Sequence, residues 1–190
     1  MAGQRNLPKM EGVECVQVSA CENHTTFLRR DGIAVGIGED TFSQCNLPTF
    51  KNGVKCIQVS SGNHHTVMLG DDGSIIAVGS NSMGQCDPPQ NPDGLTCVQV
   101  SAGRNHTVLL YDDGSVVAFC SNAKGQCSIP RLDSTVKYTQ VCAGDLHTVL
   151  LCSDGRALAV GENSSGQCSF PELEGEPALT TSQVDFEAMD

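Results

Sequence analysis

The sequence predicts an all-β protein built from four copies of one unit, and three observations predict it. Related segments recur every 41 residues, as in "VSSGNHHTVMLGDDGSIIAVGSNSMGQC", which ends at Cys86, and "VSAGRNHTVLLYDDGSVVAFCSNAKGQC", which ends at Cys127. Apolar residues within a copy alternate as they do in strands, and an Asp-Gly pair separates two β-branched runs in each copy. No window has the apolar spacing of an amphipathic helix.

The period holds at four families of positions. Each family keeps the same step of 41 residues: His24, His65, His106 and His147; Gln44, Gln85, Gln126 and Gln167; the Asp-Gly pairs that start at Asp31, Asp72, Asp113 and Asp154; and Pro48, Pro89, Pro130 and Pro171. In addition, "GQRNLP" at residues 3–8 resembles "SQCNLP" at residues 43–48. We therefore expect the chain to start near the end of one unit and to carry four full units after it.

Each unit is expected to contain three or four short strands. In the third unit, "CVQVSAG" at 97–103 predicts a strand with Val98, Val100 and Ala102 on one face and Gln99 and Ser101 on the other. Two further strands are predicted at "HTVLLY" (106–111) and "SVVAFC" (115–120), joined by "DDG", which supplies the positive-φ positions of a tight hairpin. A shorter fourth strand is expected at "QCSIP" (126–130), before a loop that contains proline.

A unit of this size lies near the floor of roughly 40 residues for independent folding, so the units must bury their faces against one another. Radial stacking of such sheets gives the blades of a β-propeller. We predict four blades of a partial or small propeller in residues 1–171 and a disordered acidic tail in 172–190, which has six acidic residues and no basic one. The ring could close as a small four-bladed propeller, by self-association with a second copy, or within a longer protein.

Composition excludes several classes of protein. A net charge of −11 repels phosphate backbones, which argues against nucleic acid as a partner. No run approaches the roughly 20 apolar residues of a membrane span, and the N-terminus has no secretion signal, so no membrane association is expected. Eleven cysteines, an odd total without a CxxC pair, indicate free thiols in a reducing compartment. We expect a cytoplasmic protein, with the nucleus as the alternative.

Residues that recur in every unit are interpreted as structural. A catalytic or metal site is normally a single constellation, whereas a residue needed once per blade serves the blade. The repeated histidines are therefore expected to bond a neighbouring loop rather than to hold a metal or act in catalysis. Cys45, Cys86, Cys127 and Cys168, with Cys15, Cys56 and Cys97, are expected to be buried between blades. The remaining Cys21, Cys120, Cys142 and Cys152 are irregular, and a thiol enzyme stays a third hypothesis.

Residues that vary between units, on loops, are the candidates for function. The candidate partner contacts are Phe42, Met83 and Lys124 between the third and fourth strands, Arg104 before the histidine, and Arg29, Arg30 and Tyr111 at the hairpin turn. Phe42, Met83 and Lys124 are expected to form one apolar, partly charged patch suited to a protein partner. The alternative is that these are solvated loop tips without a function.

The pattern "VSAGxxHTVLLxxDGxxxAxGxNxxGQC" resembles the repeat of the regulator of chromosome condensation family over residues 3–171. It is also similar to the short-repeat branch that includes a bacterial β-lactamase inhibitor. The resemblance implies a propeller, most often of seven blades, and a range of roles: exchange factor for the Ran GTPase, plant UV-B photoreceptor, inhibitor, or interaction domain within HERC-type ubiquitin ligases. The chain has no Trp, which excludes light sensing by a Trp cluster, and its acidity argues against a chromatin-binding basic surface.

These observations predict a non-catalytic module that needs no cofactor and binds another protein through its loop tips, as the recognition part of a ubiquitin ligase would. The alternative is guanine-nucleotide exchange on a small GTPase, which rests on the resemblance alone. The partner itself, a small GTPase or a ubiquitin-pathway protein, is not identified by the sequence.

Overall fold

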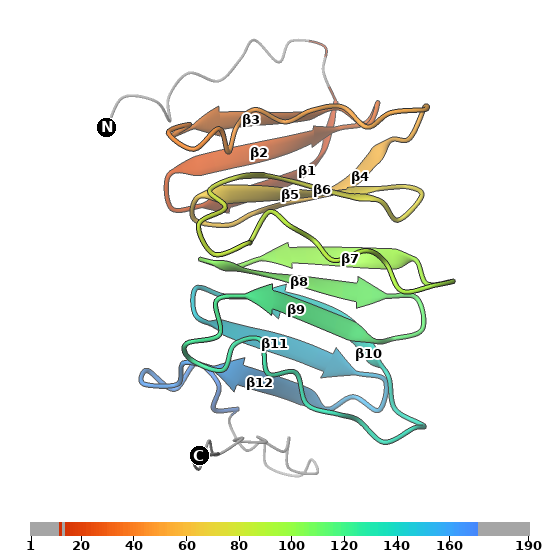
Figure 1. Ribbon diagram of the computed structural model, residues 1–190, viewed down its shortest axis with the longest axis vertical. Coiled ribbons are helices and arrows are strands. Elements are labelled where there is room, and N and C mark those ends of the chain that lie inside the picture. Colours follow the sequence, from red (N-terminus) through yellow and green to blue (C-terminus); the bar gives the residue numbers. More distant parts are fainter. Residues whose placement is uncertain (1–11, 13, 171–190) are drawn as a thin grey trace.

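The computed structural model describes residues 12 and 14–170, which form four three-stranded antiparallel sheets stacked along one axis (Figure 1). The sheets are the predicted blades. Their strands are β1 (Cys15–Cys21), β2 (His24–Arg29) and β3 (Ala34–Gly38); β4 (Cys56–Ser61), β5 (His65–Gly70) and β6 (Ile75–Gly79); β7 (Cys97–Ala102), β8 (His106–Tyr111) and β9 (Val116–Cys120); and β10 (Tyr138–Ala143), β11 (His147–Cys152) and β12 (Ala157–Gly161). The first and fourth blades lie at opposite ends of the column.

The described residues contain no helix that could cross a membrane. The starting half-unit at residues 3–8 and the acidic tail at 172–190 lie outside the described residues. The fourth strand expected at residues 126–130 does not form, because this segment makes turns instead, as in the bond from the Ser128 N–H to the Gly125 carbonyl (3.0 Å).

The predicted hairpins join the second and third strands of each blade. Gly73 and Gly114, for example, have φ angles of 80° and 84°, a conformation that residues with a Cβ rarely adopt. The aspartate before each glycine accepts a bond from the backbone N–H two residues later, at 2.9 Å from Ser74 to Asp72 and 2.8 Å from Ser115 to Asp113. The Asp-Gly pairs thus supply a hydrogen bond within each turn.

Each blade has two faces, defined here by the first strand. The front face carries Val18, Val59, Val100 or Val141, and the back face carries Gln17, Gln58, Gln99 or Gln140. The back face of one blade packs against the front face of the next, where β4 contacts β1 and β2, β7 contacts β4 and β5, and β10 contacts β7 and β8. The hydrophobic core is therefore divided into three layers between blades, and no blade has a core of its own.

A β-bulge interrupts the first strand of every blade. In β7 the pairing with β8 skips from Cys97 to Gln99, so Val98 has no partner in the ladder. The prediction that Val98 shares a face with Val100 is therefore wrong. Val98 is 47% exposed while Val100 is 1% exposed, and Cys97 takes the buried place on the front face instead.

Candidate functional site

The loops that lead from one blade to the next are built around the repeated glutamine. The Gln44 side chain is fully buried, and its Oε1 accepts a hydrogen bond from the backbone N–H of Phe42 at 2.9 Å. Gln85, Gln126 and Gln167 accept the equivalent bonds from Met83, Lys124 and Ser165 at 2.9, 2.8 and 2.9 Å. One bond, made four times, therefore fixes the backbone of a tip whose side chain differs in every blade.

A second repeated bond closes the same loops. The Cys86 N–H donates to Asn81 Oδ1 at 2.9 Å, and equivalent bonds are made by Cys45 to Asp40, Cys127 to Asn122, and Cys168 to Asn163. Each of these cysteine thiols also donates to a backbone carbonyl, as Cys86 does to Ser80 at 3.3 Å. The recurring residues hold the loop from inside, which leaves the tip residue free to vary.

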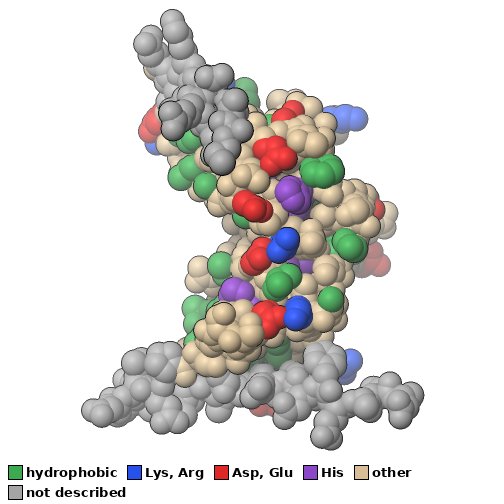
Figure 2. All heavy atoms as spheres, turned by 90° about the vertical axis from the view of Figure 1, so that its left-hand side faces the viewer, with side chains coloured by type: hydrophobic (Ala, Val, Ile, Leu, Met, Phe, Trp, Pro, Cys, Tyr) green, Lys and Arg blue, Asp and Glu red, His purple; other side chains and the backbone are tan. Residues whose placement is uncertain are grey.

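The tips lie on one side of the column, the left-hand side of Figure 1. Figure 2 shows this side and has apolar, basic, acidic and histidine side chains along its length. Phe42 and Met83 are 46% and 58% exposed, and the Phe42 ring packs on His64 with the ring centroids 5.3 Å apart. Lys124 pairs with Glu162 at 2.6 Å, and this bond, together with hydrogen bonds from Ser164, lowers the pKa of the Glu162 carboxyl to about 2. We call Phe42, Met83, Lys124 and Ser165 the loop-tip surface.

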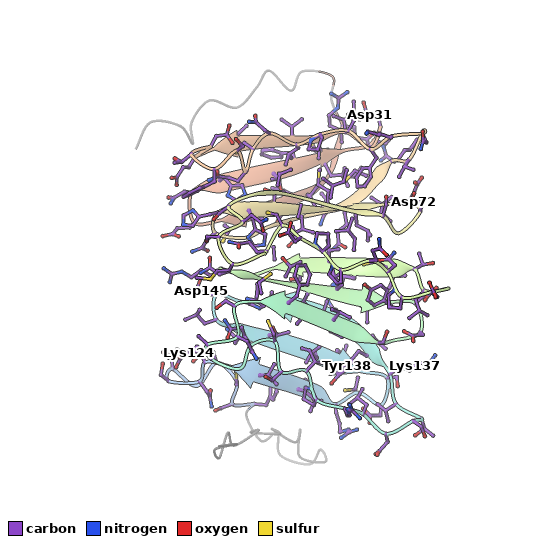
Figure 3. All side chains as sticks on the ribbon, viewed as in Figure 1. Asp31, Asp72, Lys124, Lys137, Tyr138 and Asp145 are labelled. Atoms are coloured by element: carbon purple, nitrogen blue, oxygen red, sulfur yellow. The ribbon has the colours of Figure 1, made fainter. Side chains whose placement is uncertain are left out.

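The loops between the first and second strands border the loop-tip surface. Asn63 donates to the Glu22 carboxylate at 2.7 Å, and Arg104 pairs with Asp145 at 3.6 Å while its backbone N–H donates to the Asp145 carbonyl. Asp145 and Lys124 lie on the same side of the column in Figure 3. Residues at one position of the repeat therefore pair across neighbouring blades and form a charged rim beside Phe42 and Met83.

The hairpin turns lie on the opposite side, where Figure 3 shows Asp31 and Asp72. Arg29 and Arg30 therefore do not join the loop-tip surface, and each pairs with a nearby carboxylate, Arg29 with Asp31 and Arg30 with Glu14. Tyr111 is 1% exposed and belongs to the core layer between the second and third blades. Its expected role as a partner contact is wrong, because the last position of the second strand points toward the preceding blade.

The repeated histidines bond the next blade. The Nε2 atoms of His24, His65 and His106 lie 2.9, 3.1 and 3.0 Å from the hydroxyls of Thr66, Thr107 and Thr148. Each hydroxyl donates its own proton to a glutamine carbonyl, as Thr66 does to Gln44 at 2.8 Å, so Nε2 must be the donor to the threonine. Burial lowers the pKa of His65 and His106 to about 4. These rings are therefore neutral near pH 7 and are occupied in joining blades.

Burial limits the reactivity of several cysteines. Burial raises the pKa of the Cys45, Cys86 and Cys127 thiols to about 11 and that of Cys120 to about 12, so these thiols are protonated near neutral pH. Cys56, Cys97 and Cys168 are buried as expected, whereas Cys45, Cys86 and Cys127 are only half-buried. Cys15 is exposed because no described blade covers the front face of β1. No group of residues in the described part of the chain could hold a metal ion.

An open groove that the sequence did not reveal runs along the first strands of all four blades. It has a volume of about 730 Å³, and its lining includes the bulge residues Val16, Ile57, Val98 and Thr139. Val16, Ile57 and Val98 are 50%, 52% and 47% exposed. In the first three blades, the sequence signal that could have located them is the apolar residue between the Cys and the Gln of the first strand, which strict alternation assigns to the core.

The family model of the regulator of chromosome condensation (RCC1) repeat matches residues 56–85, 97–126 and 138–167. The chain belongs to the RCC1 repeat family. Each match ends at or next to the glutamine that anchors a loop tip, so the recurring RCC1 residues include those that support the tip. No curated protein matches the chain.

Several solved structures share the fold. Prp20p of Saccharomyces cerevisiae superposes with a TM-score of 0.70 at 23% identity over 92% of this chain and 49% of Prp20p, and its structure is described with its binding properties to Gsp1p and histones. Human WBSCR16 gives 0.69 at 21% identity, covering 80% of this chain and 49% of WBSCR16. The ectodomain of the Physcomitrella patens receptor kinase CR4 gives 0.65 at 19%, covering 87% and 45%. The chain thus spans about half the length of these structures.

Proposed function

We propose that this chain is a non-catalytic module that binds another protein through the loop-tip surface. The observation that carries the proposal is the repeated glutamine bond, which is made by the buried Gln44, Gln85 and Gln126 and by the half-buried Gln167. It holds four tips in one backbone geometry while their side chains are Phe, Met, Lys and Ser. A scaffold that repeats and a tip that varies are the arrangement expected of a recognition surface on rigid supports.

The side chains of the loop-tip surface indicate which chemistry its partner needs. Phe42 and Met83 offer exposed apolar area, and the Lys124–Glu162 and Arg104–Asp145 pairs lie at its border. Apolar anchors within a polar rim are typical of protein interfaces. We propose a partner with an apolar side chain that seats between the first two tips, and the resemblance to HERC-type propellers makes a ubiquitin-pathway protein one such partner.

The experiment compares two double variants that remove similar apolar area from different surfaces. Phe42→Ala with Met83→Ala changes the loop-tip surface, and Ile57→Ala with Val98→Ala changes the groove. Proteins captured from cell extract by each immobilised variant are quantified against wild type by mass spectrometry. We expect at least one protein to be captured by wild type and the groove variant and to fall at least tenfold with the loop-tip variant. Equal capture by both variants, or loss with the groove variant alone, would contradict the proposal.

The second candidate is guanine-nucleotide exchange on a small GTPase. It is supported by the structural likeness to Prp20p, whose binding to Gsp1p is described, and it requires protein contact rather than a catalytic residue. The test is the release rate of a fluorescent guanine nucleotide from a panel of small GTPases with and without the chain. Acceleration that is lost in the loop-tip variant would support exchange, and unchanged release across the panel would reject it.

We also propose the cytoplasm or the nucleus as the compartment, because all eleven cysteines are free thiols and such thiols persist in a reducing environment. Fluorescent tagging of the chain in cells tests this, and a secreted product would contradict it.

A further inference from the structure

The three interfaces between blades use one set of hydrogen bonds. Gln17 donates its Nε2 proton to the Val59 carbonyl and accepts the Val59 N–H at its Oε1, at 3.1 and 2.9 Å. Gln58 makes the same pair with Val100, and Gln99 with Val141. The histidine-to-threonine bond accompanies the glutamine pair at every interface. The back face of a blade is therefore a defined receptor for the front face of the next.

The same interfaces bury the same apolar positions. On the back faces, Leu28, Leu69 and Leu110 are 2%, 0% and 4% exposed. On the front faces, Val59, Val100 and Val141 are 1%, 1% and 2% exposed. These leucine and valine positions lie in one layer, as Leu28 and Val59 do between the first two blades.

At the two ends of the described stack, one half of this interface is exposed: the front face at the first blade and the back face at the fourth. Val18, on the front face of the first blade, is 60% exposed, and Leu151, on the back face of the fourth, is 38% exposed. Gln140 and His147 hold the glutamine and histidine positions on that back face, and the described residues include no later blade for them to bond. The backbone of Val18 and the hydroxyl of Thr25 are the matching groups on the front face of the first blade.

We propose that the back face of the fourth blade binds the front face of the first blade in a second copy of this chain. The contact continues the interface that the molecule already forms three times, with Gln140 on the Val18 backbone, His147 on Thr25 and Leu151 beside Val18. One contact departs from the pattern. Ser60 accepts the Ala102 N–H at 2.9 Å and Ser101 the Ala143 N–H at 2.8 Å, whereas Cys142 stands at the equivalent place and is a weaker acceptor.

The proposed contact joins two different faces, so it is heterologous. Two copies that close on each other form a ring, and copies that do not close form longer stacks. Both products need one intact front face and one intact back face at each junction. This requirement separates the proposal from a symmetric contact that joins two front faces or two back faces.

The test is sedimentation velocity of the full chain from about 1 to 100 μM, with carboxylates placed on each exposed end. Val18→Asp spoils the front face of the first blade, and Leu151→Asp spoils the back face of the fourth. Val16→Asp is the matched control, because Val16 lies two residues from Val18 but faces the groove. All three positions are more than a third exposed, so the single chain should keep its fold, which circular dichroism checks.

We expect wild type and the control to associate as concentration rises, and each end variant to associate at least 100-fold more weakly, because the contact would bury an unpaired charge. A mixture of the two end variants should form a one-to-one complex, since each supplies the face that the other lacks. A wild type that stays monomeric at 100 μM would overturn the proposal. So would association that survives both end variants, or a mixture that does not combine.

Discussion

The first strands of the first and second blades have similar sequences but different surroundings. Val59 in β4 is 1% exposed and Val18 in β1 is 60% exposed, although both follow a Cys-x-Gln sequence and pair with the second strand in the same register. The difference is the preceding blade, which covers β4, whereas the described residues include no blade before β1. Stability in this fold therefore belongs to the interface between blades, as in a one-dimensional array.

The largest difference in stability between an interior interface and the end of the stack is expected for the leucine on the back face. Leu69→Ala removes a fully buried side chain from the layer between the second and third blades and should lower the free energy of unfolding by about 3 kcal/mol. Leu151→Ala, at the equivalent exposed position, should lower it by less than about 1 kcal/mol. Urea unfolding of dilute protein gives both values, and equal losses would mean that the fourth blade is covered.

A fall in pH should also destabilise the interior interfaces, because they contain buried histidines. The pKa of His65 and His106 is about 4 in the folded chain, against about 6.5 when unfolded. The unfolded chain therefore takes up protons first as pH falls, and the native state loses stability between pH 6.5 and 4, by up to roughly 3 kcal/mol for each ring. Burial also lowers the pKa of His24, which acts in the same direction.

Unfolding free energies measured from pH 7 to pH 5 test this, because the lowered pKa of carboxyls such as Glu162 acts only at lower pH. His65→Gln removes one of the titrating rings and should reduce the slope of stability against pH. Leu69→Ala is the control, since it lowers stability without removing a ring. A slope that His65→Gln leaves unchanged would show that the buried ring does not carry the effect.

The sequence predicted those parts of the fold that are set within one unit. The strands expected at 106–111 and 115–120 form at His106–Tyr111 and Val116–Cys120, because β-branched runs and an Asp-Gly turn act over a few residues. It also located the variable tips Phe42, Met83 and Lys124, since a 41-residue register shows which loop position changes. These features need no knowledge of a neighbouring blade.

Features that depend on a β-bulge or on packing between blades were not predictable. Val98 alternates with its neighbours in sequence, yet a bulge turns it into the groove. Tyr111 is a variable turn residue in sequence, yet the second blade buries it. The apolar residue between Cys97 and Gln99 marks the position of Val98 but not the side it faces, which the bulge in the β7–β8 pairing decides. The burial of Tyr111 is decided by the packing of one sheet on another.

The glutamine hydrogen bonds should give a smaller difference in stability between an interior interface and the end of the stack. Gln99→Ala would leave the N–H and carbonyl of Val141 without their partner in a buried layer, at a cost of about 2 kcal/mol. Gln140→Ala, on the open back face, should change stability by less than about 0.5 kcal/mol in dilute protein. Thermal unfolding of the two variants beside wild type measures this, and a loss at Gln140 as large as at Gln99 would refute the assignment of an uncovered face.

The smallest change in stability is expected at the last residue of the third strand. This residue is glycine in three blades and cysteine in the third blade. Gly38, Gly79 and Gly161 have φ angles of 115°, 118° and 115°, whereas Cys120 occupies the equivalent place with φ of 89°. A Cβ at Gly79 would lie 2.4 Å from the His64 carbonyl oxygen, and the bond from Ser121 to Asn105 is 3.1 Å where its three equivalents are 2.7 to 2.9 Å. The thiol is therefore accommodated by strain.

Cys120→Gly should relieve this strain and raise the free energy of unfolding by about 1 kcal/mol, because a non-glycine residue at positive φ costs roughly that amount or more. The reverse change, Gly79→Cys, should destabilise the chain, since its Cβ would meet the backbone of the neighbouring loop. Urea unfolding under reducing conditions measures both variants. If Cys120→Gly is instead destabilising, the packing of the thiol in the third blade outweighs the backbone strain, and that blade has adapted to its cysteine.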